Sequence, residues 1–204
     1  MENLTSEQFD SIDLRIWQPA KGHRYGPESL ALADFVQLKA GERVIELGSG
    51  VGVISLMLAA RAKGVSITAV EIQELLHAIA VRNVRENGYE LSVTCVNDDY
   101  RRFAEANRNA FDLVVSNPPF YVAGQGRMSP DPQRAQARHE MNGTLADLVA
   151  SADEMLAPNG RLKIVLDSRR LDELMDTAER KKFKACRSDI SNQHAFVLVE
   201  FKKA

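Results

Sequence analysis

Short, mostly apolar runs alternate along the chain with longer stretches in which apolar residues recur every three or four positions. Runs of the first kind are typical of strands buried on both faces, and stretches of the second kind are typical of the helices that cover them. The pattern predicts strands at 43–47, 66–70, 92–96, 111–116 and 161–166, and helices at 28–39, 53–63, 74–87, 101–107, 145–156 and 171–182. This alternation predicts an α/β fold with a doubly wound, Rossmann-like sheet of mostly parallel strands.

Two further strands are predicted at the end of the chain. They occupy 183–190 and 195–201 and are separated only by the polar link Ser191–His194. Because a link this short joins antiparallel neighbours, we expect a seven-stranded sheet with an antiparallel hairpin at one edge. A turn is predicted at Pro158–Gly160, directly before the fifth strand.

The length of 204 residues fits one domain with a substantial core, so we expect a single domain over 1–204. An N-terminal flanking segment and the first helix occupy 1–40, where the opening stretch is mixed and polar, with Trp17 and Tyr25 as isolated aromatic anchors. A long polar insertion at 121–143 interrupts the alternation of strands and helices. Loops of this length inside a compact domain are usually functional or disordered.

Composition and charge narrow the class of protein only slightly. Hydrophobic residues make up 45% and charged residues 26% of the chain, a balance typical of soluble globular proteins. The net charge of -2 gives no overall attraction for nucleic acid, so RNA binding would need a local basic patch. The polar start Met1-Glu2-Asn3 argues against a secretory signal, and no apolar run is long enough to span a bilayer. Cys95 and Cys186 are expected to be reduced, buried thiols of a cytoplasmic protein.

Residues suited to binding a ligand follow the first four predicted strands. They are Gly48, Gly50 and Gly52 after the first strand, Glu71 after the second, Asp98 and Asp99 after the third, and Asn117 after the fourth. Ligands of open α/β sheets bind at the carboxyl ends of the strands, where glycines allow the backbone to approach closely. A carboxylate after the second strand can accept the hydroxyls of a ribose, and one after the third can accept from an adenine amine. The sequence therefore predicts a site for a nucleoside cofactor.

The spacing of the glycines argues against two common nucleotide sites. A dinucleotide fingerprint needs a third glycine one residue later than here, at the position of Val53. The chain also lacks the Gly-Lys-Ser/Thr sequence of a phosphate-binding loop.

The run from Glu46 to Gly52 resembles the glycine motif of class I S-adenosylmethionine-dependent methyltransferases. The resemblance covers nearly the whole chain and implies S-adenosyl-L-methionine as the cofactor. It implies that Glu46 helps to position the methionine part, that Glu71 binds the ribose, and that Asp99, in preference to Asp98, binds the adenine. The expected cofactor-binding residues are Tyr25, Glu46, Gly48, Gly50, Gly52, Glu71, Ile72, Asp98, Asp99, Tyr100 and Asn117.

The tetrapeptide Asn117-Pro118-Pro119-Phe120 resembles the Asn-Pro-Pro-aromatic motif of enzymes that methylate planar amino groups. Considered alone, it fits an ordinary strand-terminating turn equally well. The nitrogen of such an amino group is a poor nucleophile, because its lone pair is delocalised. The side-chain oxygen of Asn117 and the carbonyl of Pro118 can accept its two hydrogens and direct the lone pair at the methyl group. Phe120, which stands where Tyr is more frequent, can stack on the flat substrate.

The polar insertion indicates the class of substrate. The segment from Tyr121 to Asp147, and the upstream run from Gly22 to Leu30, are similar to the family of tRNA(Val) adenine N6-methyltransferases, which act beside the anticodon. Arginines in the insertion are suited to pairing with phosphates, although a solvated surface loop is the alternative. The expected substrate-binding residues are Tyr121, Arg127, Arg134 and Arg138.

We therefore expect a cytoplasmic enzyme that methylates N6 of an adenine in tRNA. It would have no metal and no membrane association, and it would act as a monomer or homodimer. Other planar amino groups remain as alternatives, on rRNA guanine N2, DNA adenine N6 or protein glutamine N5. The glutamine-methylating relatives carry a helical domain before the glycine motif, where this chain has only about 40 residues. An alternative of a different class is a non-catalytic RNA-binding module.

Overall fold

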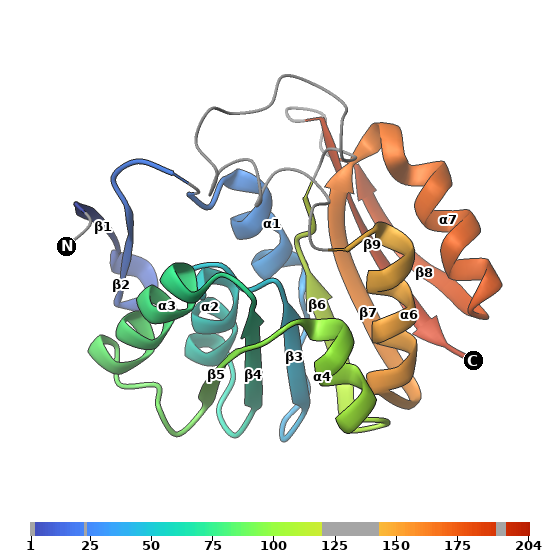
Figure 1. The fold of residues 1–204 in the computed structure, drawn as a ribbon, viewed down its shortest axis with the longest axis horizontal. Helices are drawn as coiled ribbons and strands as arrows, with labels where there is room; N and C mark the ends of the chain where they lie inside the picture. Colours follow the sequence, from blue (N-terminus) through green and yellow to red (C-terminus); the bar gives the residue numbers. More distant parts are fainter. Residues whose placement is uncertain (1–2, 23, 120–142, 191–194) are drawn as a thin grey trace.

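The computed structural model describes residues 3–22, 24–119, 143–190 and 195–204 and contains a seven-stranded sheet of order β5-β4-β3-β6-β7-β9-β8 (Figure 1). The strands are β3 Arg43–Leu47, β4 Ser66–Glu71, β5 Val93–Asn97, β6 Phe111–Ser116, β7 Leu156–Asp167, β8 Phe183–Ile190 and β9 Phe196–Lys203. The first five run parallel, and β9 lies antiparallel between β7 and β8. The predicted fold class and the antiparallel hairpin at one edge are both confirmed.

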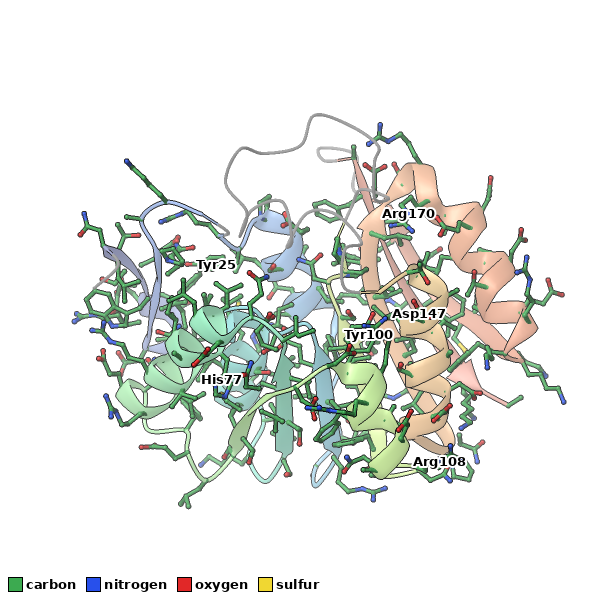
Figure 2. All side chains as sticks on the ribbon, viewed as in Figure 1. Tyr25, His77, Tyr100, Arg108, Asp147 and Arg170 are labelled. Carbon is green, nitrogen blue, oxygen red and sulfur yellow. The ribbon has the colours of Figure 1, made fainter. Side chains whose placement is uncertain are left out.

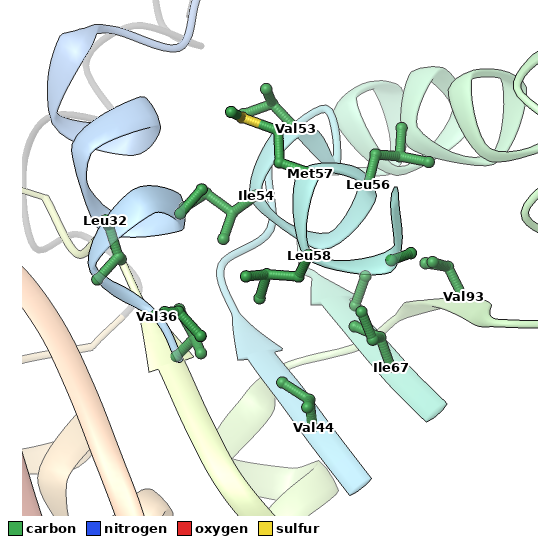
Figure 3. Close-up of a cluster of buried hydrophobic side chains, with 14 of the residues drawn as sticks. Leu32, Val36, Val44, Val53, Ile54, Leu56, Met57, Leu58, Ile67 and Val93 are labelled. Carbon is green, nitrogen blue, oxygen red and sulfur yellow. The ribbon is translucent and has the colours of Figure 1, made fainter. Parts of the chain in front are cut away.

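Helices cover both faces of the sheet (Figure 1). They are α1 Pro27–Phe35, α2 Val53–Arg61, α3 Glu74–Glu86, α4 Tyr100–Ala106, α6 Leu145–Met155 and α7 Leu171–Arg180, with short 3₁₀ helices η1 Asp10–Ile12 and η2 Ser168–Arg170. Helices α1, α2 and α3 pack on one face, together with Val44 and Leu113 (Figure 3). Helices α4, α6 and α7 pack on the other, together with Ile45 and Val114. Neighbouring strand residues point to opposite faces, so these apolar strands are buried on both sides.

The boundaries of most elements lie within two residues of those predicted, and those of α1 and β7 differ by four or more. Helix α1 ends at Phe35 instead of residue 39, because Val36 is extended while its N–H still bonds the carbonyl of Leu32. Strand β7 begins at Leu156, so the predicted turn at Pro158–Gly160 lies inside it. Asn159 has a positive φ of 64°, and the pairing with β6 shifts at this point. The turn residues thus interrupt the ladder without ending the strand.

The N-terminal stretch, for which the sequence predicted no element, forms a two-stranded antiparallel hairpin of β1 Leu4–Phe9 and β2 Leu14–Pro19. Most side chains of β1 lie at the surface, so their sequence carries no apolar alternation. In β2, Leu14 and Ile16 are fully buried and join the core on the α2–α3 side.

Two asparagines, Asn83 in α3 and Asn87 at its C-cap, fasten this hairpin to the rest of the protein. The side chain of Asn83 accepts from Trp17 N at 2.8 Å and donates to Trp17 O at 2.9 Å. The side chain of Asn87 accepts from Arg15 N at 2.9 Å and donates to Arg15 O at 2.8 Å. One helical turn matches the spacing of alternate strand residues, so the two amides take the place of a neighbouring strand beside β2.

The expectation that both thiols are buried is wrong for Cys186, which is exposed because β8 is the edge strand of the sheet. Cys95 is partly buried, and both thiols are free. Within the described residues, no helix is long and apolar enough to cross a membrane.

Candidate active site

The strand-end residues predicted as ligands meet at one edge of the sheet. Strand β3 lies between β4 and β6, and Leu47 pairs with both Val70 and Ser116. The residues that follow these strands therefore emerge side by side, at the same end of the sheet (Figure 1). The chain runs from β3 outward in one direction to β4 and β5 and later in the other to β6 and β7. This is the topological switch point, where open α/β sheets bind ligands.

The glycine turn between β3 and α2 is left-handed at three positions. The φ angles are 71° at Gly48, 55° at Gly50 and 80° at Gly52, a region that favours glycine. Both Gly48 N and Ser49 N donate to the carbonyl of Val70, at 2.9 and 3.0 Å, which holds the turn against β4. A Cβ added at Gly48 would meet no atom of the described residues within 4 Å. The turn therefore leaves space beside Gly48 for a ligand to approach the backbone.

Ser49 supplies an independent sign of a ligand beside the turn. Its hydroxyl oxygen is buried and has no hydrogen-bond partner among the residues that the structure describes. A buried polar atom without a partner is uncommon in folded proteins, because its desolvation is not compensated. A polar ligand in the space beside Gly48 would supply that partner.

The buried carboxylate of Glu71 is held by two backbone amides, one from the glycine turn after β3 and one from the residues that follow β4. Gly50 N donates to one of its oxygens at 2.8 Å, and Gln73 N donates to the other at 2.8 Å. Burial raises the pKa of Glu71, whereas these backbone hydrogen bonds favour the charged form. Each oxygen can accept more than one hydrogen bond, so both can also accept from vicinal hydroxyls.

Glu46 lies fully buried below the turn and binds the start of α2. Its carboxyl accepts from Ser55 N at 2.9 Å and from Ser55 Oγ at 2.5 Å. Burial raises the pKa of Glu46 to about 8, against the opposing effect of the hydrogen bonds from Ser55. The residue thus joins β3 to α2 on either side of the glycine turn.

The two candidate adenine ligands both contact arginines of α4. Asp99 caps the helix by accepting from Arg101 N at 2.9 Å, and its two oxygens receive Arg101 Nε at 3.0 and 3.1 Å. These bonds lower the pKa of Asp99. Asp98 accepts from Arg102 Nε at 2.8 Å. An amine that reaches either carboxylate would share it with an arginine.

The remaining predicted cofactor ligands surround this edge of the sheet. Ile72 follows β4 and is partly exposed, and Tyr100 opens α4. A Cβ at Gly143 would lie 2.4 Å from the hydroxyl of Tyr100, so only glycine fits there. The hydroxyl of Tyr25 donates to Glu7 of β1 at 2.6 Å, and Tyr25 lies on the hairpin side of Figure 2. Burial and this bond raise the pKa of Tyr25.

The tetrapeptide Asn117-Pro118-Pro119-Phe120, predicted to hold the methyl acceptor and called the acceptor tetrapeptide below, begins directly after β6. Ser116 Oγ donates to Leu47 O at 2.8 Å, which holds the exit of β6 against that of β3. The side-chain nitrogen of Asn117 donates to Ser29 Oγ at 2.9 Å. This bond uses the amide nitrogen, so the amide oxygen is the group that Asn117 can offer to a substrate. The carbonyl of Pro119 accepts from Arg170 Nη1 at 3.2 Å.

Five predicted residues lie outside the residues that the structure describes: Phe120, Tyr121, Arg127, Arg134 and Arg138. Conversely, the structure adds Ser29, Asn83 and Arg170, which were not identified from the sequence. Asn83 also donates to the carbonyl of Val51 in the glycine turn, at 2.9 Å. Its polar side chain on the apolar side of α3 was a usable signal. Ser29 lies within the run from Gly22 to Leu30 that resembles the tRNA(Val) family, but nothing in that run marks it as the partner of Asn117, and no local pattern marks Arg170.

Comparisons with known proteins match this chain to methyltransferases. The family model for the methyltransferase small domain matches residues 25–199. The tRNA1(Val) (adenine(37)-N6)-methyltransferase of Aeromonas hydrophila is 36% identical over 157 residues, which cover 74% of this chain and 63% of that protein. The enzyme of the same name from Bacteroides fragilis is 27% identical over 171 residues, covering 83% of this chain and 71% of the relative.

Solved structures share the fold at low identity. The tRNA m1G37 methyltransferase of M. jannaschii has a TM-score of 0.68 at 16% identity, over 99% of this chain and 57% of that one. P. horikoshii TYW2 in complex with MeSAdo has a TM-score of 0.70 at 15% identity, over 99% and 72% of the two chains.

Proposed function

The chain belongs to the methyltransferase small domain family, and from this membership we propose that it transfers a methyl group from S-adenosyl-L-methionine to N6 of an adenine in tRNA. The names of the curated relatives favour the adenine beside the anticodon of a tRNA(Val). This chain spans 63% of the length of the Aeromonas relative, so the complete activity is part of the proposal. The observation that carries it is the hydrogen bond from Asn117 to Ser29, which presents the amide oxygen of Asn117 beside the glycine turn.

The residues around the glycine turn fit the cofactor. The open space at Gly48 suits the polar methionine end, and so does the buried hydroxyl of Ser49, which has no partner among the described residues. Glu71, held by two backbone amides, suits the ribose hydroxyls, and Asp99 or Asp98 suits the adenine amine. When bound, the cofactor supplies an electrophilic methyl group on a positively charged sulfur.

The acceptor residues orient the nitrogen for attack on that methyl group. The amide oxygen of Asn117 and the carbonyl of Pro118 accept the two hydrogens of the adenine amino group, which directs its lone pair at the methyl carbon. These acceptors also stabilise the positive charge that develops on the nitrogen. After transfer the nitrogen is acidic and loses a proton to solvent, so no general base is needed beforehand. Phe120 is proposed to stack on the base.

The proposed RNA contacts come from the insertion at 121–143, through Tyr121, Arg127, Arg134 and Arg138. Arginines pair with phosphates and fix the register of the RNA, while the acceptor residues select the base. An adenine in an anticodon loop is already single-stranded, so its extrusion into the site costs little free energy. A tRNA substrate also implies a cytoplasmic location.

An assay of the purified chain with radiolabelled methyl donor on total tRNA, rRNA and DNA tests the proposal. We expect label in tRNA and its recovery as N6-methyladenosine after digestion. Label confined to rRNA or DNA would contradict the tRNA assignment. An Asn117→Ala variant should keep its fold, still bind S-adenosylhomocysteine, and transfer no methyl group. A protein that binds tRNA but never labels it would instead be the non-catalytic module.

A further inference from the structure

We propose that Arg170 is a positioning residue of the acceptor site, which acts by fixing the peptide group that follows Pro119. The proposal rests on the proposed function, since it concerns the same acceptor tetrapeptide. Arg170 is the last residue of η2 and only 8% exposed, although it is an arginine. In Figure 2 it lies where the chain passes from β7 to α7, at the end of the sheet that carries the site.

Within the part of the chain that the structure describes, three donors of Arg170 contact two partners at once. Nε and Nη2 donate to the two carboxylate oxygens of Glu173, at 2.8 and 2.9 Å. Nη1 donates to the carbonyl of Pro119 at 3.2 Å. The bidentate pair with Glu173 sets the plane of the guanidinium and thereby aims Nη1 at the carbonyl. A lysine has a single ammonium group and cannot reproduce this arrangement.

The path of the chain brings Arg170 to the tetrapeptide. Strand β7 pairs with β6 up to Ile164 and Ser116 and then continues to Asp167. The carboxylate of Asp167 accepts from Arg169 N at 2.9 Å and caps η2. This short helix brings Arg170 into contact with Pro119, although the two residues are 51 positions apart in the chain.

The proline pair leaves one degree of freedom that Arg170 removes. A proline ring fixes φ but not ψ, and the nitrogen has no hydrogen to donate. Rotation about ψ of Pro119 swings its carbonyl and, with it, the direction in which the chain continues. A donor held on that carbonyl fixes ψ. The tetrapeptide is therefore held at two positions, at Asn117 by Ser29 and at Pro119 by Arg170.

Kinetic measurements on variants test the role of Arg170. Arg170→Ala and Arg170→Lys should each lower kcat about tenfold, because each loses one charge-assisted hydrogen bond. The affinity of both variants for S-adenosylhomocysteine should stay within about twofold of wild type. Glu173→Gln should give a smaller loss of kcat. Arg180→Ala is the matched control, because it removes the same charge at the exposed far end of α7.

Two kinetic results would overturn the proposal. One is a wild-type kcat in Arg170→Lys, which would show that the planar, bidentate geometry of the guanidinium is irrelevant. The other is a parallel loss of kcat, cofactor affinity and melting temperature in Arg170→Ala, which would mark a purely structural residue.

A measurement that does not depend on activity separates this proposal from the proposed function. Amide hydrogen exchange in the ligand-free protein should be faster at the end of β6 in Arg170→Ala than in wild type or Arg180→Ala, with β3 unchanged. An unchanged exchange rate there would refute the positioning role. If the wild-type protein methylates no tRNA, the proposed function fails while the exchange data still decide the role of Arg170.

Discussion

The side-chain nitrogen of Asn117 donates a hydrogen bond of 2.9 Å to the hydroxyl of Ser29, a residue 88 positions earlier in the chain. Ser29 lies in the first turn of α1 and is only 4% exposed. Asn117 belongs to the acceptor tetrapeptide, whereas α1 precedes the glycine turn. The orientation of the acceptor amide is therefore set by a helix outside the tetrapeptide and outside the predicted cofactor motif.

Replacement of Ser29 by alanine should lower turnover. Without its partner the amide of Asn117 can rotate and present its nitrogen to the substrate, so kcat should fall about five- to tenfold, as expected for one hydrogen bond. The affinity for S-adenosylhomocysteine, measured by calorimetry, should stay at the wild-type value. Ser151→Ala is a suitable control, because Ser151 is a buried serine on α6, on the opposite face of the sheet. A wild-type kcat in Ser29→Ala would show that Asn117 is oriented by other contacts.

Asn83 in α3 and Asn87 at its C-cap form a natural matched pair. Both bind the backbone of β2, but only Asn83 also binds the carbonyl of Val51 in the glycine turn. Replacing either by alanine leaves backbone groups of β2 unpaired and should lower the free energy of unfolding by about 1–3 kcal/mol. Only Asn83→Ala should also weaken binding of S-adenosylhomocysteine. Equal affinities in the two variants would show that the contact to Val51 does not support the cofactor site.

Glu46 should make the stability of the ligand-free protein depend on pH. Its pKa is raised from an ordinary value of 4.5 to about 8 by burial, so the folded protein holds a proton that the unfolded chain releases. The stabilising effect of this proton is complete below about pH 4.5 and is lost as the pH rises through about 8. The melting temperature should therefore fall over this range.

Glu46→Gln separates this effect from that of other groups. The variant keeps a neutral side chain at every pH, so its melting temperature should fall less between pH 5 and pH 9 than that of wild type. The remaining slope includes Glu71, whose pKa is also raised by burial. Identical pH profiles of the two proteins, measured by thermal unfolding, would show that Glu46 is charged throughout.

Asp98 and Asp99 can be distinguished by single substitutions. Asp99→Ala removes the cap of α4 and should cost about 1 kcal/mol of stability. If Asp99 binds the adenine, the Asp99→Ala variant should also bind S-adenosylhomocysteine more weakly than the Asp98→Ala variant does. Calorimetric titration of both variants decides between them, and a stronger effect from Asp98→Ala would reverse the assignment.

The sequence alone determined the sheet and the place of the candidate site. Its central strands are short and apolar on both faces, as with Val44 and Ile45 of β3, because they are covered by helices on either side. Gly48, Glu71 and Asn117 are local signals, since Glu71 ends a strand and the other two directly follow one. Parallel pairing then brings such residues to one edge without further information.

The tertiary structure decided what holds these residues in position. The hairpin of β1 and β2 is stabilised by its docking on α3, and the exposed side chains of β1 give it no periodic pattern. Ser29 and Arg170 reach the tetrapeptide across 88 and 51 residues. Contacts of this kind depend on where separate elements pack in space, and no local pattern of hydrophobic and polar residues specifies the partner.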